Sequence, residues 1–250
     1  MFRVPTFYFK LWLLLFRYSL IYKREYLSLK SQSLEKAKEY ILSLRKQWIH
    51  ESLKVVGISL TVLGKENLTE NESIVYVTNH QGSFDIPCLF EALPINTAFI
   101  AKKELFTLPF LGFWIKETGC IPIDRSTPRK GMQSILDAVE SIKNGTNLVI
   151  FPEGTRSRDP EGKMLPFKKG SLKVAIKSKS KIIPLAIEGT RHVFDKSYQD
   201  SEVKVVVSIG EAVETENLSK EEKDNLAESI NQKVIELHQR CRNEISSKHD

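Results

Sequence analysis

Seven short β-rich runs recur between Ile58 and Ile209, and stretches with helical spacing or turn residues separate them. Short runs bounded in this way are typical of strands, and their alternation with helices favours a sheet covered by helices. The expected strands are Ile58–Leu63, Ile74–Thr78, Ala98–Lys102, Cys120–Asp124, Leu148–Phe151, Ile182–Ile187 and Val203–Ile209. The sequence therefore predicts an α/β fold with a mixed sheet of about seven strands, preceded by an N-terminal helical hairpin.

Two later helices carry clear end signals. Apolar side chains from Met132 to Ile142 recur at helical spacing, and Gly145 follows as a C-terminal glycine. The segment Ser219–Glu222 is a capping box, and the helix that it begins carries Leu226, Ile230, Val234 and Leu237 on one face. Both helices are expected to cover the sheet.

The first 22 residues are rich in apolar and aromatic side chains, which Arg3, Lys10 and Arg17 interrupt. A membrane-spanning helix needs about 20 mostly uncharged residues, and no small-residue cleavage site of a secretory signal precedes Lys23. Basic side chains reach lipid headgroups while aromatic and leucine side chains lie at the acyl boundary. We therefore predict a helix that lies on a bilayer, and the alternative is a helix of the domain core.

Residues 23–57 are predicted to form a second helix, because apolar side chains from Leu34 to Leu53 recur at three- and four-residue steps. Together with the first segment it makes the helical hairpin. No Pro/Gly-rich linker follows, so the boundary is a soft one. The expected domains are a membrane-associating hairpin over residues 1–55 and an α/β domain over residues 56–250.

The charge balance and the cysteines narrow the chemistry. Lysine plus arginine exceeds aspartate plus glutamate by 6, which favours anionic partners such as lipid headgroups, phosphorylated metabolites or nucleic acid. Cys88, Cys120 and Cys241 lie far apart without a C-x-x-C pair, so zinc and redox chemistry are not indicated. Reduced thiols facing the cytoplasm are the expected state.

The first candidate catalytic residues lie in the segment Asn79–Asp85, directly after a predicted strand. A histidine with an ordinary pKa of about 6.5 is available in its neutral form near neutral pH to take a proton from a hydroxyl. Asp85 is expected in the first turn of a helix, from which it can turn back to His80 and stabilise the imidazolium. On its own this spacing also fits a structural pair, so further residues are needed.

The second candidate segment is Phe151–Ser157, which follows another apolar run. A strand that breaks at Pro-Glu-Gly places the carboxylate of Glu153, backbone N–H groups and the guanidinium of Arg156 at one sheet edge. Arginine suits a phosphate because its planar fork makes two charge-assisted hydrogen bonds. The alternative is a turn with a surface ion pair.

Two further segments, Ala101–Leu105 and Gly119–Arg125, also end apolar runs with cations. Lys102 or Lys103, Arg125 and Arg156 would then converge from three strand ends on one phosphate. The alternative for each lysine is a solvated surface charge.

These segments in this order resemble the motifs of the glycerol-3-phosphate and 1-acylglycerol-3-phosphate acyltransferase family. That family carries N-H-x4-D, G-x-I-x-I-D-R, F-P-E-G-T-R-S and V-P-x-x-I blocks. The chain offers Asn79–Asp85, Gly119–Arg125, Phe151–Ser157 and Ile183–Ile187. The resemblance covers residues 58–190, and bacterial membrane-bound members are also similar in having an N-terminal two-helix hairpin.

The resemblance implies roles for individual residues. His80 is implied as the general base, Asp85 as its orienting partner, and Lys102, Arg125, Glu153, Gly154, Thr155 and Arg156 as the acceptor site, with Lys102 on the phosphate. No metal and no cofactor are implied, and acyl-CoA or acyl carrier protein is the co-substrate. Many members have serine two residues after the histidine, where this chain has Gly82, so the role of the neighbouring Ser83 is left open.

The expected reaction moves a fatty acyl group to the free hydroxyl of 1-acylglycerol 3-phosphate, giving phosphatidic acid in phospholipid synthesis. The clamped phosphate positions the hydroxyl against His80, and backbone N–H groups near Gly82 or Gly154 are expected to stabilise the oxyanion. The expected partners are membrane lipids, the lysophospholipid acceptor and the acyl thioester. The expected location is the cytoplasmic face of a membrane.

Three alternatives compete with this interpretation. A serine hydrolase using Ser83 is disfavoured, because adjacent residues on one turn do not place the base between nucleophile and carboxylate, and no G-x-S-x-G motif occurs. A lipid- or nucleic-acid-binding module needs no His/Asp pair, and Tyr76 and Phe99 are too few for an RNA stacking platform, so no nucleic acid is expected. The same chemistry on glycerol 3-phosphate or another lysophospholipid is left open.

Overall fold

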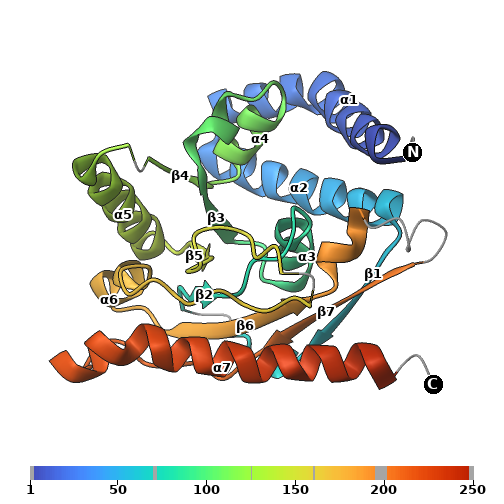
Figure 1. The fold of residues 1–250 in the computed structure, drawn as a ribbon. Coiled ribbons are helices and arrows are strands. Elements are labelled where there is room, and N and C mark those ends of the chain that lie inside the picture. The colour runs from blue at the N-terminus through green and yellow to red at the C-terminus, as the bar shows by residue number, and fades with distance from the viewer. Residues whose placement is uncertain (1–2, 70–71, 125, 160, 195–201, 248–250) are drawn as a thin grey trace.

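The computed structural model describes residues 3–69, 72–124, 126–159, 161–194 and 202–247 (Figure 1). The α-helices are α1 (Arg3–Gln32), α2 (Leu34–Val56), α3 (Asp85–Ala92), α4 (Leu111–Glu117), α5 (Pro128–Lys143), α6 (Lys173–Ser178) and α7 (Lys220–Ser247). The strands are β1 (Ile58–Leu63), β2 (Val75–Val77), β3 (Thr97–Lys102), β4 (Ile121–Ile123), β5 (Asn147–Ile150), β6 (Ile182–Glu188) and β7 (Val203–Ile209). Short 3-10 helices are η1 (Lys65–Asn67), η2 (Lys103–Thr107) and η3 (Thr190–Phe194).

The strands form one mixed sheet in the order β1-β7-β6-β2-β5-β3-β4. β6, β2, β5, β3 and β4 run parallel, whereas β7 is antiparallel to β6 and parallel to β1. The carboxyl ends of the five parallel strands therefore meet at the same edge, where ligands commonly bind in such sheets. The predicted α/β fold is confirmed, and each expected strand end lies within one residue of the observed one.

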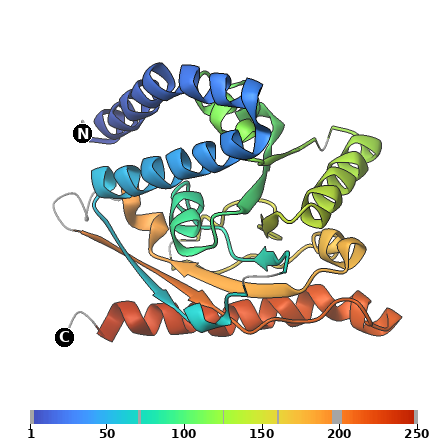
Figure 2. The same ribbon diagram turned by 180° about the vertical axis from the view of Figure 1, so that it is seen from behind.

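Helices cover both faces of the sheet, with α7 on one side and α2 with α3 on the other (Figures 1 and 2). On the α7 side, Val77 and Ile150 pack with Val234. On the opposite side, Tyr76 packs with Leu89 of α3. Successive residues of β2 thus point to opposite faces, as in any strand, and both faces are apolar because both are covered. The core fixes the position at which β2 ends.

The turn of the N-terminal hairpin lies at Ser33, so the predicted helix break near residue 22 is wrong. α1 continues through the charged segment 23–32, which contains no glycine or proline to end a helix. Ser33 is extended, with φ −155°, and its side chain accepts a hydrogen bond from the Lys36 N–H at 3.3 Å. A serine N-cap of this kind begins a new helix and thereby places the turn.

α2 belongs to two apolar clusters. Ile41 packs with Tyr26 of α1 and Trp114 of α4, whereas Ile49 and Leu53 pack in the cluster on the sheet. The hairpin is therefore joined to the sheet by a continuous helix rather than by a linker. The division of the chain at residue 55 stays a prediction.

The two predicted helix-end signals are confirmed. The Ser219 N–H donates to Glu222 Oε2 at 2.7 Å, and the Glu222 N–H donates to Ser219 Oγ at 3.2 Å, which completes the capping box of α7. Gly145 follows α5 with φ 85°, and its N–H donates to Ile142 O. That left-handed conformation is what a glycine supplies after a helix.

Candidate active site

A short loop after β2 carries His80 to the carboxyl edge of the sheet. The Asn79 side chain continues the strand pairing there: its Nδ2 donates to Ile187 O at 2.9 Å, and its Oδ1 accepts from the Ile187 N–H at 2.9 Å. Asn79 is 1% exposed, so this pairing satisfies buried polar groups on both strands. Asn79 therefore fixes the point at which the chain leaves the sheet toward His80.

His80 and Asp85 form a hydrogen-bonded pair with 2.6 Å between Nδ1 and Asp85 Oδ2. Asp85 is fully buried, and its Oδ2 also accepts from the backbone N–H of Gln81 at 2.7 Å and of Gly82 at 3.0 Å. Its Oδ1 accepts from the Thr190 hydroxyl. Because an ionised carboxylate only accepts, the imidazole proton lies on Nδ1, and Nε2 of the neutral ring is left as an acceptor.

The surroundings of His80 restrict its ring. The ring stacks on Phe151 with a centroid distance of 4.1 Å, and the side chain is 15% exposed. Within the described ranges of the chain, no residue hydrogen-bonds Nε2. The structure thus brings the predicted pair together in the geometry of a base and its orienting acid, while its catalytic role stays a prediction.

The Glu153 carboxylate accepts hydrogen bonds from two backbone N–H groups. Its Oε1 accepts from the His80 N–H at 2.7 Å, and its Oε2 accepts from the Leu165 N–H at 3.0 Å. Burial raises the pKa of Glu153, and the two backbone hydrogen bonds oppose that effect only in part. The Ser157 N–H also donates to His80 O at 2.8 Å. Glu153 therefore holds the two loops together, and its predicted contact with the acceptor stays a prediction.

Lys102 and Arg156, two of the predicted phosphate-binding cations, follow neighbouring strands of the same edge. Lys102 ends β3 and is exposed, and Thr155 and Arg156 are exposed in the loop after β5, next to the half-buried Gly154. Because β3 and β5 are parallel neighbours, their carboxyl ends lie side by side. Arg125 lies outside the described residues.

Lys103 differs from Lys102 in being paired. Its Nζ lies 2.9 Å from Asp124 Oδ2, just after β4, and the Lys130 Nζ lies 3.6 Å from the same oxygen. Hydrogen bonds from Ser126 and then Lys103 lower the pKa of the Asp124 carboxyl. Of the two lysines proposed for the phosphate, Lys102 is the one that the structure leaves at the edge without a carboxylate partner in the described part of the chain.

The N–H groups of Gly82 and Gly154 themselves bind within the protein, and an oxyanion donor near either glycine stays a prediction. The Gly82 N–H donates to Asp85 Oδ2, and the Gly154 N–H donates to Phe151 O at 3.0 Å. Gly154 has φ 73°, the left-handed conformation of a tight turn that uses its own N–H internally. Both N–H groups therefore stabilise the loops of the protein.

Sequence reasoning missed Thr190 as a partner of Asp85. Thr190 follows β6 through Gly189, which has φ 102° and where an added Cβ would lie 2.2 Å from Lys204 O. Only glycine fits this close approach, and the turn brings the Thr190 hydroxyl back to Asp85. The available signal was a polar Glu-Gly-Thr run directly after a buried strand at the same edge.

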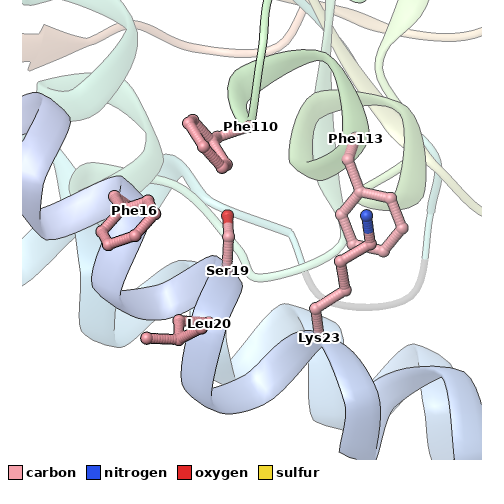
Figure 3. Close-up of a pocket in the computed structure, with 6 residues that line it drawn as sticks. All are labelled: Phe16, Ser19, Leu20, Lys23, Phe110 and Phe113. Atoms are coloured by element: carbon pink, nitrogen blue, oxygen red, sulfur yellow. The ribbon is translucent and has the colours of Figure 1, made fainter.

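An apolar hollow of about 290 Å³ lies between α1 and the N-terminal end of α4, and none of the predicted site residues lines it (Figure 3). Its lining consists of Phe16, Ser19, Leu20, Lys23, Phe110 and Phe113. Phe110 has φ 62° and ψ −56° at the centre of a γ-turn, in which the Leu111 N–H donates to Pro109 O at 2.7 Å. Edge-on contacts with Trp12 and Phe16, at 5.8 and 5.4 Å between centroids, pack Phe110 against α1.

The comparisons with known proteins agree on one family. The family described as Acyltransferase matches residues 59–188. The 1-acyl-sn-glycerol-3-phosphate acyltransferase of Saccharomyces cerevisiae is 32% identical over 198 residues, which cover 76% of this chain and 65% of the yeast protein. The protein of that name from Borreliella burgdorferi is 28% identical over 185 residues, which cover 74% of this chain and 73% of that protein.

A solved structure is similar over nearly the whole chain. The crystal structure of the 1-acyl-sn-glycerophosphate (LPA) acyltransferase PlsC from Thermotoga maritima has a TM-score of 0.71 and 30% identity. The match covers 92% of this chain and 95% of that one. The chain covers 65% of the yeast relative's own length and 62% of that of a relative from Limnanthes douglasii.

A mixed sheet covered by helices, with a hydrogen-bonded His/Asp pair at the carboxyl edge of its parallel strands, defines the class of this α/β protein. The family's pattern matches more than half of the 250 residues, and the chain belongs to the acyltransferase family. The family expected from the four sequence blocks is confirmed.

Proposed function

We propose that this protein is a 1-acylglycerol-3-phosphate O-acyltransferase, which transfers a fatty acyl group from acyl-CoA or acyl carrier protein to lysophosphatidic acid and gives phosphatidic acid. The observation that carries the proposal is the His80–Asp85 pair, in which a buried carboxylate holds Nδ1 at 2.6 Å and leaves Nε2 to accept a proton. The names of the relatives from yeast, B. burgdorferi and T. maritima support the choice of acceptor.

In the proposed reaction, His80 Nε2 takes the proton of the acceptor hydroxyl as its oxygen attacks the thioester carbonyl. The new C–O bond forms, the carbonyl electrons move to oxygen, and their return breaks the C–S bond. The imidazolium then gives its proton to the departing thiolate, so an ester and a thiol are the products. Asp85 stabilises the imidazolium while it exists, and the reaction uses no metal, no cofactor and no acyl-enzyme.

The exposed cations at the sheet edge support an acceptor that bears a phosphate. Lys102 ends β3 and Arg156 lies in the loop after β5, the neighbouring parallel strand, so the two residues offer one ammonium and one guanidinium. A guanidinium binds a phosphate through two parallel hydrogen bonds, which fixes the orientation of the acceptor as well as its position. Arg125, which follows β4 in the sequence, is the third cation of the proposed site.

The proposed enzyme works at the cytoplasmic face of a membrane, with α1 lying on the lipid. Large apolar side chains of α1 are exposed, among them Phe9 at 59%, Leu20 at 71% and Ile21 at 51%. Within the described part of the chain, no helix is both long enough and apolar enough to cross a bilayer. An exposed apolar row with Lys10 and Arg17 beside it suits the boundary between headgroups and acyl chains.

The test uses the purified protein in detergent, with acyl-CoA as donor and release of free thiol followed over time. Lysophosphatidic acid is expected to accelerate thiol release and to become phosphatidic acid, detected by chromatography. Parallel reactions receive glycerol 3-phosphate or no acceptor. Equal thiol release without acceptor would show hydrolysis and contradict the proposal, and release only with glycerol 3-phosphate would change the acceptor.

A further inference from the structure

A buried charged cluster behind the His80 loop joins three elements of the fold. Glu188, at the end of β6, is 3% exposed, and its Oε2 accepts from Gln81 Nε2 at 2.7 Å. The same oxygen lies 2.5 Å from Nε2 of His238 on α7, and Glu188 Oε1 pairs with Arg191. The C-terminal helix is thereby connected to the loop that carries the proposed base.

The protonation states follow from these contacts. Burial raises the pKa of Glu188, but the hydrogen bonds from His238 and Gln81 outweigh it, so that the pKa lies below its ordinary value. An ionised carboxylate only accepts, so His238 carries a proton on Nε2 and Gln81 directs its amide N–H toward Glu188. Hydrogen bonds to an ionised group are about twice as strong as those between neutral groups, so the cluster is held firmly.

Gln81 connects this cluster to Asp85. Its side chain binds Glu188, while its backbone N–H donates to Asp85 Oδ2 at 2.7 Å, and the N–H of the next residue, Gly82, donates to the same oxygen. An added Cβ on Gly82 would lie 3.0 Å from Thr190 O, so the loop is closely packed. Holding the Gln81 side chain therefore fixes the two peptide N–H groups that orient Asp85.

We propose that Glu188 and His238 are positioning residues of the active site, which hold Gln81 so that its peptide orients Asp85 against His80. This inference rests on the proposed function, in which His80 is the base. Glu188 and His238 are buried, at 3% and 7% exposed. They therefore act by holding Gln81 and do not contact the substrate. The consequence is that α7, far along the chain, controls the geometry of the base.

The kinetic test compares two substitutions of His238 in the full chain. His238→Leu removes the donor to Glu188 and is expected to lower kcat by about ten- to hundredfold, the range for a small misplacement of reacting groups, while KM for lysophosphatidic acid stays within about twofold. His238→Gln keeps an amide donor and is expected to recover most of kcat. The matched control is Asn231→Leu, which removes another buried polar side chain of α7 outside the cluster and should leave kcat unchanged.

A double variant tests the route through Gln81. Gln81→Leu is expected to lower kcat as His238→Leu does, and the double variant should be no worse than either single one, because both break the same connection. Multiplied losses would overturn the proposal. If His238→Leu does not fold, His238→Gln and Gln81→Leu alone still decide, because the former must retain kcat and the latter must lose it.

The spectroscopic test needs no substrate. In protein with isotope-labelled histidine nitrogen, the His80 Nδ1 resonance is assigned by its loss in His80→Ala, and it reports the hydrogen bond to Asp85. It is expected to move in His238→Leu and to stay in Asn231→Leu. If the wild type transfers no acyl group but the resonance moves, the proposed function fails and the positioning stands. If the wild type is active and His238→Leu changes neither kcat nor the resonance, the positioning is overturned.

Discussion

The loops around His80 and the helix α1 differ in how they place their side chains. Around His80, the carboxylates of Asp85 and Glu153 are at most 2% exposed, and each of their oxygens accepts a hydrogen bond. Along α1, Phe9 and Leu20 leave more than half of their surface exposed. A buried polar group without a partner is costly, so the first region is fixed in one geometry. An exposed apolar row lacks such a constraint and suits an apolar partner such as lipid. The proposed function assigns the chemistry to the loops around His80 and the approach to lipid substrate to α1.

The largest expected effect is that of removing the proposed base from the loops around His80. His80→Ala should lower the rate of acyl transfer by about 10² to 10⁴-fold, the contribution of a general base. The fold should survive, because Asp85 keeps its hydrogen bonds from Gln81, Gly82 and Thr190. Thiol release at matched protein folding, checked by circular dichroism, measures it. Asp85→Asn should be slightly milder. A His80→Ala protein that kept more than half of the rate would remove His80 from the role of base.

The second effect concerns binding of the acceptor by Arg156, at the same sheet edge as His80. Arg156→Ala should raise KM for lysophosphatidic acid by about 10- to 100-fold, the equivalent of one hydrogen bond to a charged group, and hardly change KM for acyl-CoA. Steady-state kinetics with each substrate varied in turn measure the two constants. Lys177→Ala, an exposed cation on α6, is the control and should change neither. Equal changes for both substrates would place Arg156 in the donor site.

Features formed by neighbouring residues could be predicted from the sequence, whereas contacts between distant residues could not. The strands, the capping box and the His80–Asp85 pair are local patterns, each within a few residues, and all are present in the structure. The hydrogen bond from Thr190 to Asp85 joins residues 105 positions apart, and the contact of Gln81 with His238 joins residues 157 positions apart. No periodicity in the sequence encodes such contacts, because the order of strands in the sheet creates them.

One error has a local physical cause, and the two glycines of the site loops show how a loop uses its own N–H groups. The helix break was expected where the composition changes from apolar to charged, but a change of composition does not end a helix, and Ser33 does so through its side-chain cap. The N–H groups of Gly82 and Gly154 donate to a carboxylate and a carbonyl within the loops, so the oxyanion donor predicted near these glycines would be another N–H group. A glycine in a motif indicates a tight backbone, and it does not say which acceptor its N–H will find.

The third effect concerns lipid binding by the exposed apolar side chains of α1. Ile21→Glu should weaken sedimentation with anionic phospholipid vesicles by about tenfold, because burying one large apolar side chain in lipid is worth about 1.5–3 kcal/mol. Its rate on dispersed short-chain acceptor should stay unchanged. The control is Leu136→Glu on α5, where the side chain is 46% exposed, compared with 51% for Ile21. If both variants sediment like the wild type, α1 is not the lipid-binding surface. Point substitution is sharper than deletion of residues 1–22, which would also remove Tyr18, a buried residue of the hairpin.

The smallest expected effect is a pH dependence of stability that comes from the buried cluster of Glu188, behind the His80 loop. The pKa of Glu188 lies below its ordinary value of 4.5, because hydrogen bonds from His238 and Gln81 outweigh the effect of burial. The folded state therefore holds the ionised form more strongly than the unfolded chain does. Its stabilisation is complete above the ordinary value and is lost as the pH falls through the lower folded pKa.

The midpoint of thermal unfolding should accordingly be lower for Glu188→Gln than for the wild type near neutral pH, and the difference should shrink as the pH falls below 4.5. Scans of both proteins across this range measure it, with Glu228→Gln as the control, because Glu228 is exposed on α7. A difference that stayed constant with pH would mean that the carboxylate is not linked to folding through its proton. A difference that vanished in high salt would show a screened surface pair, whereas a buried cluster should keep most of its contribution. The salt dependence therefore distinguishes the buried cluster of Glu188 from a surface charge pair.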